Sequence, residues 1–168
     1  MLTDLVQIRL EGEKKRDENL RFRRFMKSRD HSDRILRRIA QGIEESIDCT
    51  QCANCCKVAT VTVSGRDIDR MARYLRVSRT QFLARYTTES EEEGRILRRT
   101  ESAGCIFLDG TTCTLYDERP ETCRRFPHLV RGSGSIASRM WQFADRACYC
   151  PIVYNSLEAF KPELGFRR

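Results

Sequence analysis

Nine cysteines in a chain of 168 residues are the side chains of this sequence most able to do chemistry. Four of them form one short run with two-residue gaps between the first three, namely Cys49, Cys52, Cys55 and Cys56. Such gaps let a tight loop direct successive sulfurs at one point, and thiolate is a soft ligand that suits zinc, copper(I) and iron–sulfur clusters. The other five are Cys105, Cys113, Cys123, Cys148 and Cys150. The pattern therefore predicts a metal centre.

The start of the chain sets the expected compartment. Met1 to Leu10 mixes apolar and polar residues around Asp4, and no apolar run reaches the roughly 20 residues of a membrane span. We therefore expect a cytoplasmic protein that has no membrane segment. Cytosolic thiols are kept reduced, so many cysteines in that compartment indicate metal or redox chemistry. Their odd number also excludes a complete set of intramolecular disulfides.

The identity of the metal stays open between an iron–sulfur cluster, which the spacing favours, and zinc. Bacterial-type ferredoxins have a similar run with two-residue gaps and a distant cysteine followed by proline, and here Pro151 follows Cys150. Structural zinc sites more often have two separate cysteine knuckles. Because side chains of adjacent residues diverge in an extended chain, Cys55 and Cys56 can seldom serve one metal. Eight cysteines would fill two four-thiolate sites and leave one over, Cys148 or Cys56.

A four-thiolate centre needs positive charge around it. With zinc(II) or a cluster core of charge +2, its net charge is about −2, which nearby cations and N–H donors stabilise. Arg119 and Arg124 lie close to Cys123 in the sequence and are candidates for this role, as is Arg125; the alternative is that they are solvated surface. His128 is a possible ligand that the surplus of cysteines makes unnecessary. We expect His31, in a charged stretch, to be exposed.

Hydrophobic periodicity predicts an α+β protein, in which a small cysteine-rich domain of short strands and helices (49–168) follows an N-terminal helical arm (1–48). In the arm we expect a helix over about 2–10 and an amphipathic helix carrying Ile35 to Ile47, with a break near 29–33. Ser64 and Ser78 each begin a capping box that opens a helix. Strands are expected at 58–63, 96–97, 105–108, 113–116 and 136–143, with a hairpin turn at Asp109-Gly110 and a last helix near 154–160.

The order of these elements resembles the CxxCxxCC family of cysteine-cluster proteins, the zinc- or iron-chelating domain family, over about residues 49–151. The resemblance rests on the cysteine run, Cys105-Ile-Phe-Leu-Asp, Cys113-Thr-Leu-Tyr, Arg119-Pro120, Cys123-Arg-Arg-Phe-Pro127 and Cys150-Pro151. It implies a metal-binding domain with eight ligands: Cys49, Cys52, Cys55, Cys56, Cys105, Cys113, Cys123 and Cys150, with Cys148 as a substitute for Cys150. The family is distantly similar to flagellin lysine methylases, which are iron–sulfur proteins, but this chain is much shorter.

Three functions follow as hypotheses, and whether the protein is an enzyme stays open. The first is a metal-cluster protein whose centre is structural or redox-active. The second is a zinc-stapled module that binds a ribosome, nucleic acid or protein, because the net charge is +7 and the arm is rich in basic residues, including Arg21, Arg23, Arg24, Lys27, Arg37 and Arg38. The third is a cluster-dependent methyl-transferring enzyme, although no nucleotide-binding glycine fingerprint is present. The apolar stripe of the arm either packs on its own domain or meets a protein partner or a second copy.

Overall fold

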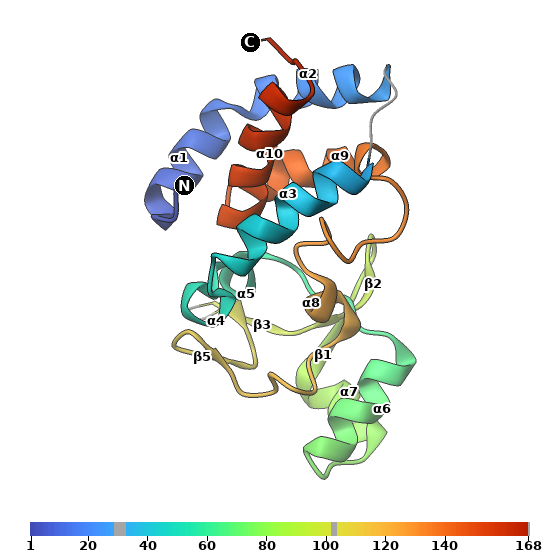
Figure 1. Cartoon of the computed structure of the whole chain (residues 1–168). Coiled ribbons are helices and arrows are strands. Elements are labelled where there is room, and N and C mark those ends of the chain that lie inside the picture. The colour runs from blue at the N-terminus through green and yellow to red at the C-terminus, as the bar shows by residue number, and fades with distance from the viewer. Residues whose placement is uncertain (29–32, 102–103, 168) are drawn as a thin grey trace. The chain divides into compact units, whose positions relative to one another are not determined.

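The computed structural model describes residues 1–28, 33–101 and 104–167, and it divides into two compact units (Figure 1). Unit 1 comprises Met1–Asp48 and Phe126–Arg168, and unit 2 comprises Cys49–Arg125. Residues 126–168, which the sequence analysis groups with the cysteine region, thus pack with the N-terminal helices. Helices and short antiparallel strand pairs together make the fold α+β, as the sequence predicts. Within the described residues, no helix is both long and apolar enough to cross a membrane.

Unit 1 is helical throughout its regular structure. Its helices are α1 (Leu5–Lys14), α2 (Arg16–Lys27), α3 (Asp33–Glu45), α9 (Ile136–Arg146) and α10 (Pro151–Glu163). Helix α10 packs along α3, and α2 packs on α9. Phe22, Leu36, Phe143 and Phe160 are fully buried in the shared core. The apolar stripe of the arm therefore closes on the C-terminal helices of the same unit. Binding of a partner through the arm stays a prediction.

The expected strand at 136–143 is wrong, because this segment is part of α9. Its buried residues Ile136, Met140, Phe143 and Ala144 recur at three- and four-residue steps, which place them on one helix face. Ser135 caps the helix by accepting a hydrogen bond from the Ser138 N–H (3.1 Å). The spacing of the buried side chains matches the helical period and not the two-residue period of a strand.

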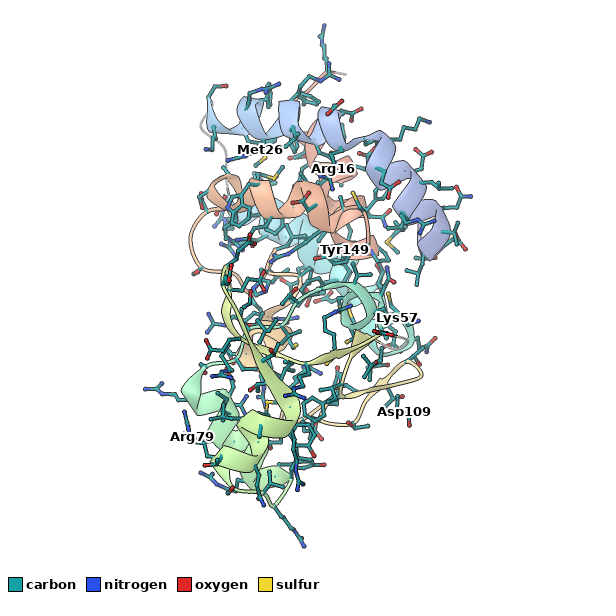
Figure 2. All side chains as sticks on the ribbon, turned by 180° about the vertical axis from the view of Figure 1, so that it is seen from behind. Arg16, Met26, Lys57, Arg79, Asp109 and Tyr149 are labelled. Carbon is teal, nitrogen blue, oxygen red and sulfur yellow. The ribbon has the colours of Figure 1, made fainter. Side chains whose placement is uncertain are left out.

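Arg37 of α3 stabilises the loop before α9. Its guanidinium donates hydrogen bonds to four main-chain carbonyls, those of Leu129, Val130, Gly132 and Gly134. These bonds use most of the N–H groups of Arg37. Arg37 therefore holds a loop of its own unit, whereas the nucleic-acid hypothesis would have it contact a phosphate. Arg16 of α2 also pairs within the unit, with Asp145 of α9 at 3.0 Å, and its side chain is labelled in Figure 2.

A mostly buried charge network joins α2 and α10. Lys161 donates to Glu18 (2.6 Å) and to Glu158 (2.5 Å), and Lys15 pairs with Glu158 and also donates to Tyr154. Burial by itself would raise the pKa of Glu158. The hydrogen bonds from Lys15 and Lys161 outweigh burial, and they hold the pKa of this carboxyl below its usual value.

We expect this network to make unit 1 sensitive to acid. A carboxyl whose pKa is lower in the folded state stabilises the fold above its unfolded pKa, about 4.3 for glutamate. That contribution is lost as the pH falls through the folded pKa. The difference in free energy of unfolding between wild type and Glu158→Gln, measured with urea, should therefore be larger at pH 7 than at pH 3. An unchanged difference would show that Glu158 does not titrate with folding. Both proteins have the same cysteines, so any loss of metal in acid affects both and cancels in the difference between their free energies of unfolding.

Unit 2 begins with four helices, and the two longer ones have the caps that the sequence predicts. The helices are α4 (Cys49–Cys52), α5 (Asn54–Val58), α6 (Gly65–Tyr74) and α7 (Arg79–Tyr86). Ser64 and Ser78 form complete capping boxes, with Asp67 and Gln81 respectively. Met71 and Phe82 are fully buried in the core of this unit.

Short strands and one helix complete unit 2. They are β1 (Thr87–Ser90), β2 (Gly94–Leu97), β3 (Arg99–Thr100), β4 (Gly104–Cys105), β5 (Leu108–Asp109), β6 (Thr112–Cys113) and α8 (Glu121–Arg125). The strands pair consecutively as three antiparallel hairpin-like ladders. The predicted turn at Asp109-Gly110 joins β5 and β6, although both strands are shorter than expected. No full strand covers 58–63, where Thr62 makes a single bridge to Ile96.

Candidate metal centre

Unit 2 holds all the cysteines up to residue 123 and folds the early run against the later ones. Helix α4, which carries Cys49 and Cys52, packs on β6, which ends at Cys113. Helix α5, which carries Cys55 and Cys56, packs on β4, which ends at Cys105. Helix–strand packing therefore joins segments that lie about fifty to sixty residues apart in the sequence.

One residue, Ala53, turns the chain between α4 and α5. Its φ is 47°, in the left-handed region, and its side chain is buried. Its N–H donates to the Cys49 carbonyl (3.1 Å), and its own carbonyl accepts from the Cys56 N–H (3.0 Å). The cysteine run is thus two helical turns joined by a tight reversal. The expectation that Cys55 and Cys56 diverge assumed an extended chain, whereas both residues lie in helix α5.

Burial and neighbouring groups shift the pKa values of four thiols in unit 2. The hydrogen bond with Cys55 lowers the pKa of Cys56 to about 7 against the opposing effect of burial. Burial raises the pKa of Cys105 and of Cys113, and it raises that of Cys123 to about 12. The charge of Cys56 adds to the increase at all three. All four side chains also belong to or pack on one hydrophobic cluster, so they are neighbours in space.

The thiols of the described residues are not grouped closely enough to coordinate a single metal ion. Among the described residues, no three or more histidine, cysteine, aspartate or glutamate side chains lie close enough together to hold one metal ion. All nine cysteines are within the described part of the chain, and no disulfide joins any of them. Coordination would therefore require these neighbouring thiols to close on the metal, in keeping with the coupling of metal binding to folding.

Arg99 is a cation near the cysteines that the sequence analysis missed. It lies directly opposite Cys105 in the β3–β4 ladder. Its guanidinium donates to the carbonyls of Ala59 (2.7 Å) and Lys57 (2.5 Å), at the end of α5 just beyond Cys56. Its charge lowers the pKa of Cys56 and opposes the rise at Cys105. The sequence offers little sign of this contact, because Arg99 and Cys105 are six residues apart. They lie opposite each other only because β3 and β4 pair in antiparallel register.

The three cations expected from the sequence have different surroundings, and Arg125 pairs with Glu121 of its own helix at 2.6 Å. The charge of Arg119 acts on Cys56, Cys113 and Cys123, in each case favouring the thiolate. The guanidinium of Arg119 also lies 3.7 Å from the centre of the Tyr116 ring. Arg124 instead donates to the main-chain carbonyls of Arg119 (3.1 Å) and Asp117, so its contacts secure the loop before Cys123.

These residues fit a thiolate-ligated metal. The potential donor atoms are all sulfur, which suits zinc and iron–sulfur clusters and disfavours hard cations such as magnesium. The buried Nε of Arg119 has no hydrogen-bond acceptor among the described residues. An unpaired buried donor is costly, and the sulfur of a charged thiolate centre would provide an acceptor. Arg99 and Arg119 together supply the positive charge that a centre of net charge about −2 requires.

Gly104 allows β4 to approach α5 closely. Its φ is 83°, and a Cβ on this residue would lie 2.6 Å from the Cys56 carbonyl oxygen and 2.7 Å from the Lys57 Cα. Both of these are backbone atoms, which cannot move aside as a flexible side chain could. The missing side chain is therefore what lets Cys105, the next residue, lie near Cys56.

We expect Gly104→Ala to lower both metal content and melting temperature, because the new methyl group pushes β4 away from α5. Gly110→Ala is the matched control: its φ is also positive (59°), but a Cβ there meets nothing within 4 Å. The control should lose only the free energy that a residue with a Cβ needs to adopt a positive φ, about 1–2 kcal/mol. Equal metal content and equal stability in the two variants, measured by elemental analysis and thermal unfolding, would show that the close approach is unimportant.

The other predicted site residues lie in unit 1. Cys150 is buried in its core at the N-terminal end of α10. Cys148 is half-buried, and its Sγ–H donates to the Ala144 carbonyl (3.7 Å). His128 lies beside Phe126 with a left-handed φ of 69°. Their roles as ligands stay predictions. His31 lies outside the described residues.

Comparison with known proteins agrees with this chemistry. A family model described as "CxxCxxCC: Putative zinc- or iron-chelating domain" matches residues 48–151. The chain belongs to the CxxCxxCC family. The match covers the whole of unit 2 and the part of unit 1 that contains Cys148 and Cys150. Family membership supports metal binding in general, and the family description names both zinc and iron.

A relative from Methanocaldococcus jannaschii, titled "Uncharacterized protein MJ0661", is 37% identical over 112 residues. The alignment covers 63% of this chain and 57% of that protein, so this CxxCxxCC protein spans little more than half the length of its relative. No solved structure matches the chain.

Proposed function

We propose that this CxxCxxCC protein holds a thiolate-ligated metal centre in unit 2, an iron–sulfur cluster by preference and zinc as the alternative. The observation that supports this most is the gathering of Cys56, Cys105, Cys113 and Cys123, four thiols from separate elements, around one cluster with Arg119 beside them. Because metal binding is coupled to folding, we propose that the metal completes the approach of these thiols.

The full ligand set that we propose has eight members. Cys49, Cys52 and Cys55 lie on α4 and α5, whose packing on β6 and β4 brings them to the same part of unit 2. Cys150 is the eighth by resemblance to the family, with Cys148 as its substitute. Eight thiolates match two four-thiolate sites or one larger cluster with bridging thiolates.

The role we propose for the centre is structural or redox. When bound, zinc supplies a fixed cross-link and an iron–sulfur cluster supplies electron transfer. The chain's own residues would bury the thiols, neutralise their charge through Arg99 and Arg119, and limit access of water. We place the protein in the cytoplasm, where thiol ligands stay reduced.

Purification of the full chain without oxygen, followed by elemental analysis, sulfide determination and an absorption spectrum, tests the proposal. Iron with acid-labile sulfide and broad visible absorption would establish the cluster. A colourless protein with stoichiometric zinc would support the alternative, a structural centre. Failure to retain or take up either metal after anaerobic reconstitution would overturn the proposal.

A further inference from the structure

One buried carboxylate, that of Asp67 at the start of α6, connects two helices of unit 2. It accepts the Ser64 N–H (3.0 Å) and the Ser64 hydroxyl (2.6 Å), which completes the cap of its own helix. It also accepts the N–H of Glu121 (3.1 Å), the first residue of α8. Only 3% of Asp67 is exposed, so these bonds are shielded from water. Helix α8 carries Cys123 two residues later.

Arg70, one turn along α6, holds the residues just before α8. One guanidinium nitrogen donates both to Asp67 (2.8 Å) and to the main-chain carbonyl of Arg119 (3.0 Å). Its Nε forms an ion pair with Glu118 at 3.2 Å. A further contact, between the hydroxyls of Thr62 and Thr122 (3.1 Å), fixes the residue next to Cys123.

The segment 118–122 is thus held at four successive places: the Glu118 carboxylate, the Arg119 carbonyl, the Glu121 N–H and the Thr122 hydroxyl. The Arg119 guanidinium, whose charge favours the Cys56 thiolate, belongs to this segment, and Cys123 follows the segment directly. A helix cap needs only the bonds to Ser64. The bonds to the backbone of residues 119 and 121 are additional, and they fix the position of an element that bears a candidate ligand.

We propose that Asp67 and Arg70 are positioning residues of the metal centre, which hold the 118–122 segment so that Cys123 and Arg119 meet the bound metal. This inference rests on the proposed function. Residues that orient the ligands of a metal site typically change its affinity by about 10–100-fold when replaced. We expect the effect of these two residues to be selective, because their hydrogen bonds and ion pair within the described residues reach the segment before Cys123 and not the segments that carry Cys105 or Cys56.

The test uses the full chain loaded with Co²⁺, a probe whose absorption reports thiolate ligation. Wild type is compared with Asp67→Asn, which keeps the size of the side chain but removes its charge. The matched control is Asp69→Asn on the same helix, because Asp69 is exposed. Among the described residues, Asp69 pairs with Arg79, which is labelled in Figure 2, and with no residue of the 118–122 segment. Each cysteine is then treated with an alkylating reagent and quantified by mass spectrometry.

We expect Asp67→Asn to bind Co²⁺ about 10–100-fold more weakly, with Cys123 alkylated at least about 10-fold faster in the loaded protein. Cys105 should stay as protected as in wild type, and Asp69→Asn should match wild type in both measurements. A merely structural role for Asp67 would not produce this selective loss. Equal protection of Cys123 in variant and wild type, or simultaneous loss of protection at Cys105, would overturn the inference.

A second variant keeps the inference testable if Asp67→Asn does not fold. Arg70→Lys retains the charge but lacks the planar fork that reaches both the Arg119 carbonyl and Glu118, so it should also expose Cys123 selectively. Protection of Cys123 in Arg70→Lys equal to wild type would again overturn the inference. If wild type retains and takes up neither iron nor zinc after anaerobic reconstitution, the proposed function fails, and the positioning role falls with it; that result is recognised before any variant is made. Wild type that holds iron or zinc but leaves Cys123 unprotected would overturn the positioning role alone.

Discussion

Replacing Cys123 by serine is expected to strip the protein of its metal and to lower its melting temperature sharply. A serine hydroxyl is a hard, neutral group that does not replace a soft thiolate on zinc or an iron–sulfur cluster. Replacing a residue that only hydrogen-bonds to a metal ligand weakens metal binding by about 10–100-fold. Replacing a ligand itself should therefore weaken metal binding by more than about 100-fold. Since structural metal binding contributes directly to folding, the fold should weaken together with the site. Elemental analysis and calorimetry of the full chain measure both effects.

Two other cysteines serve as comparisons for Cys123→Ser. Cys148→Ser should leave metal content close to that of wild type, because Cys148 is half-buried in unit 1 and is the surplus thiol of the resemblance. Cys150→Ser should behave like Cys123→Ser if Cys150 is the eighth ligand. A full metal complement and an unchanged melting temperature in Cys123→Ser would refute the ligand assignment. Metal loss in Cys148→Ser with none in Cys150→Ser would exchange the roles of those two residues.

Replacing Lys161 by methionine is expected to destabilise the protein by about 3–5 kcal/mol, the usual consequence of removing one partner from a buried ion pair. The Lys161 side chain is only 4% exposed, and its ammonium contacts Glu18 at 2.6 Å and Glu158 at 2.5 Å. Methionine fills a similar volume without charge, so the two carboxylates lose the cation that they share. The free energy of unfolding in urea at pH 7 measures the loss.

Lys14→Met is the matched control for Lys161→Met. The Lys14 side chain is 74% exposed and approaches Glu11 at 3.5 Å, a pair of the exposed kind that contributes little. The control should therefore change stability by less than about 1 kcal/mol. Metal content should stay at the wild-type level in both variants, because neither lysine lies in unit 2 and Lys161 is near the opposite end of α10 from Cys150. Similar stability of the two variants would mean that the buried network is not a significant source of folding energy.

Features that depend on nearby residues were predictable from the sequence. The boxes at Ser64 and Ser78 place a hydroxyl three residues before its partner, and that spacing alone brings cap and helix together. The Asp109-Gly110 turn is equally local, since Gly110 adopts the positive φ that the turn needs. The prediction of a strand at 136–143 was wrong. Packing of Ile136, Met140 and Phe143 into the core of unit 1 made the segment helical instead.

Sequence by itself determined the chemistry of the candidate centre: many soft thiol ligands, an odd number, and a run with two-residue gaps. Only the tertiary structure decided which thiols are neighbours and which cations accompany them. Arg99 reaches the site through strand pairing, and Asp67 reaches the Cys123 segment through a hydrogen bond across 54 residues. The physical reason is that spacing along a chain constrains distances only within a turn or two. Contacts between remote segments depend on packing and on main-chain hydrogen bonds, which form only when the whole unit has folded.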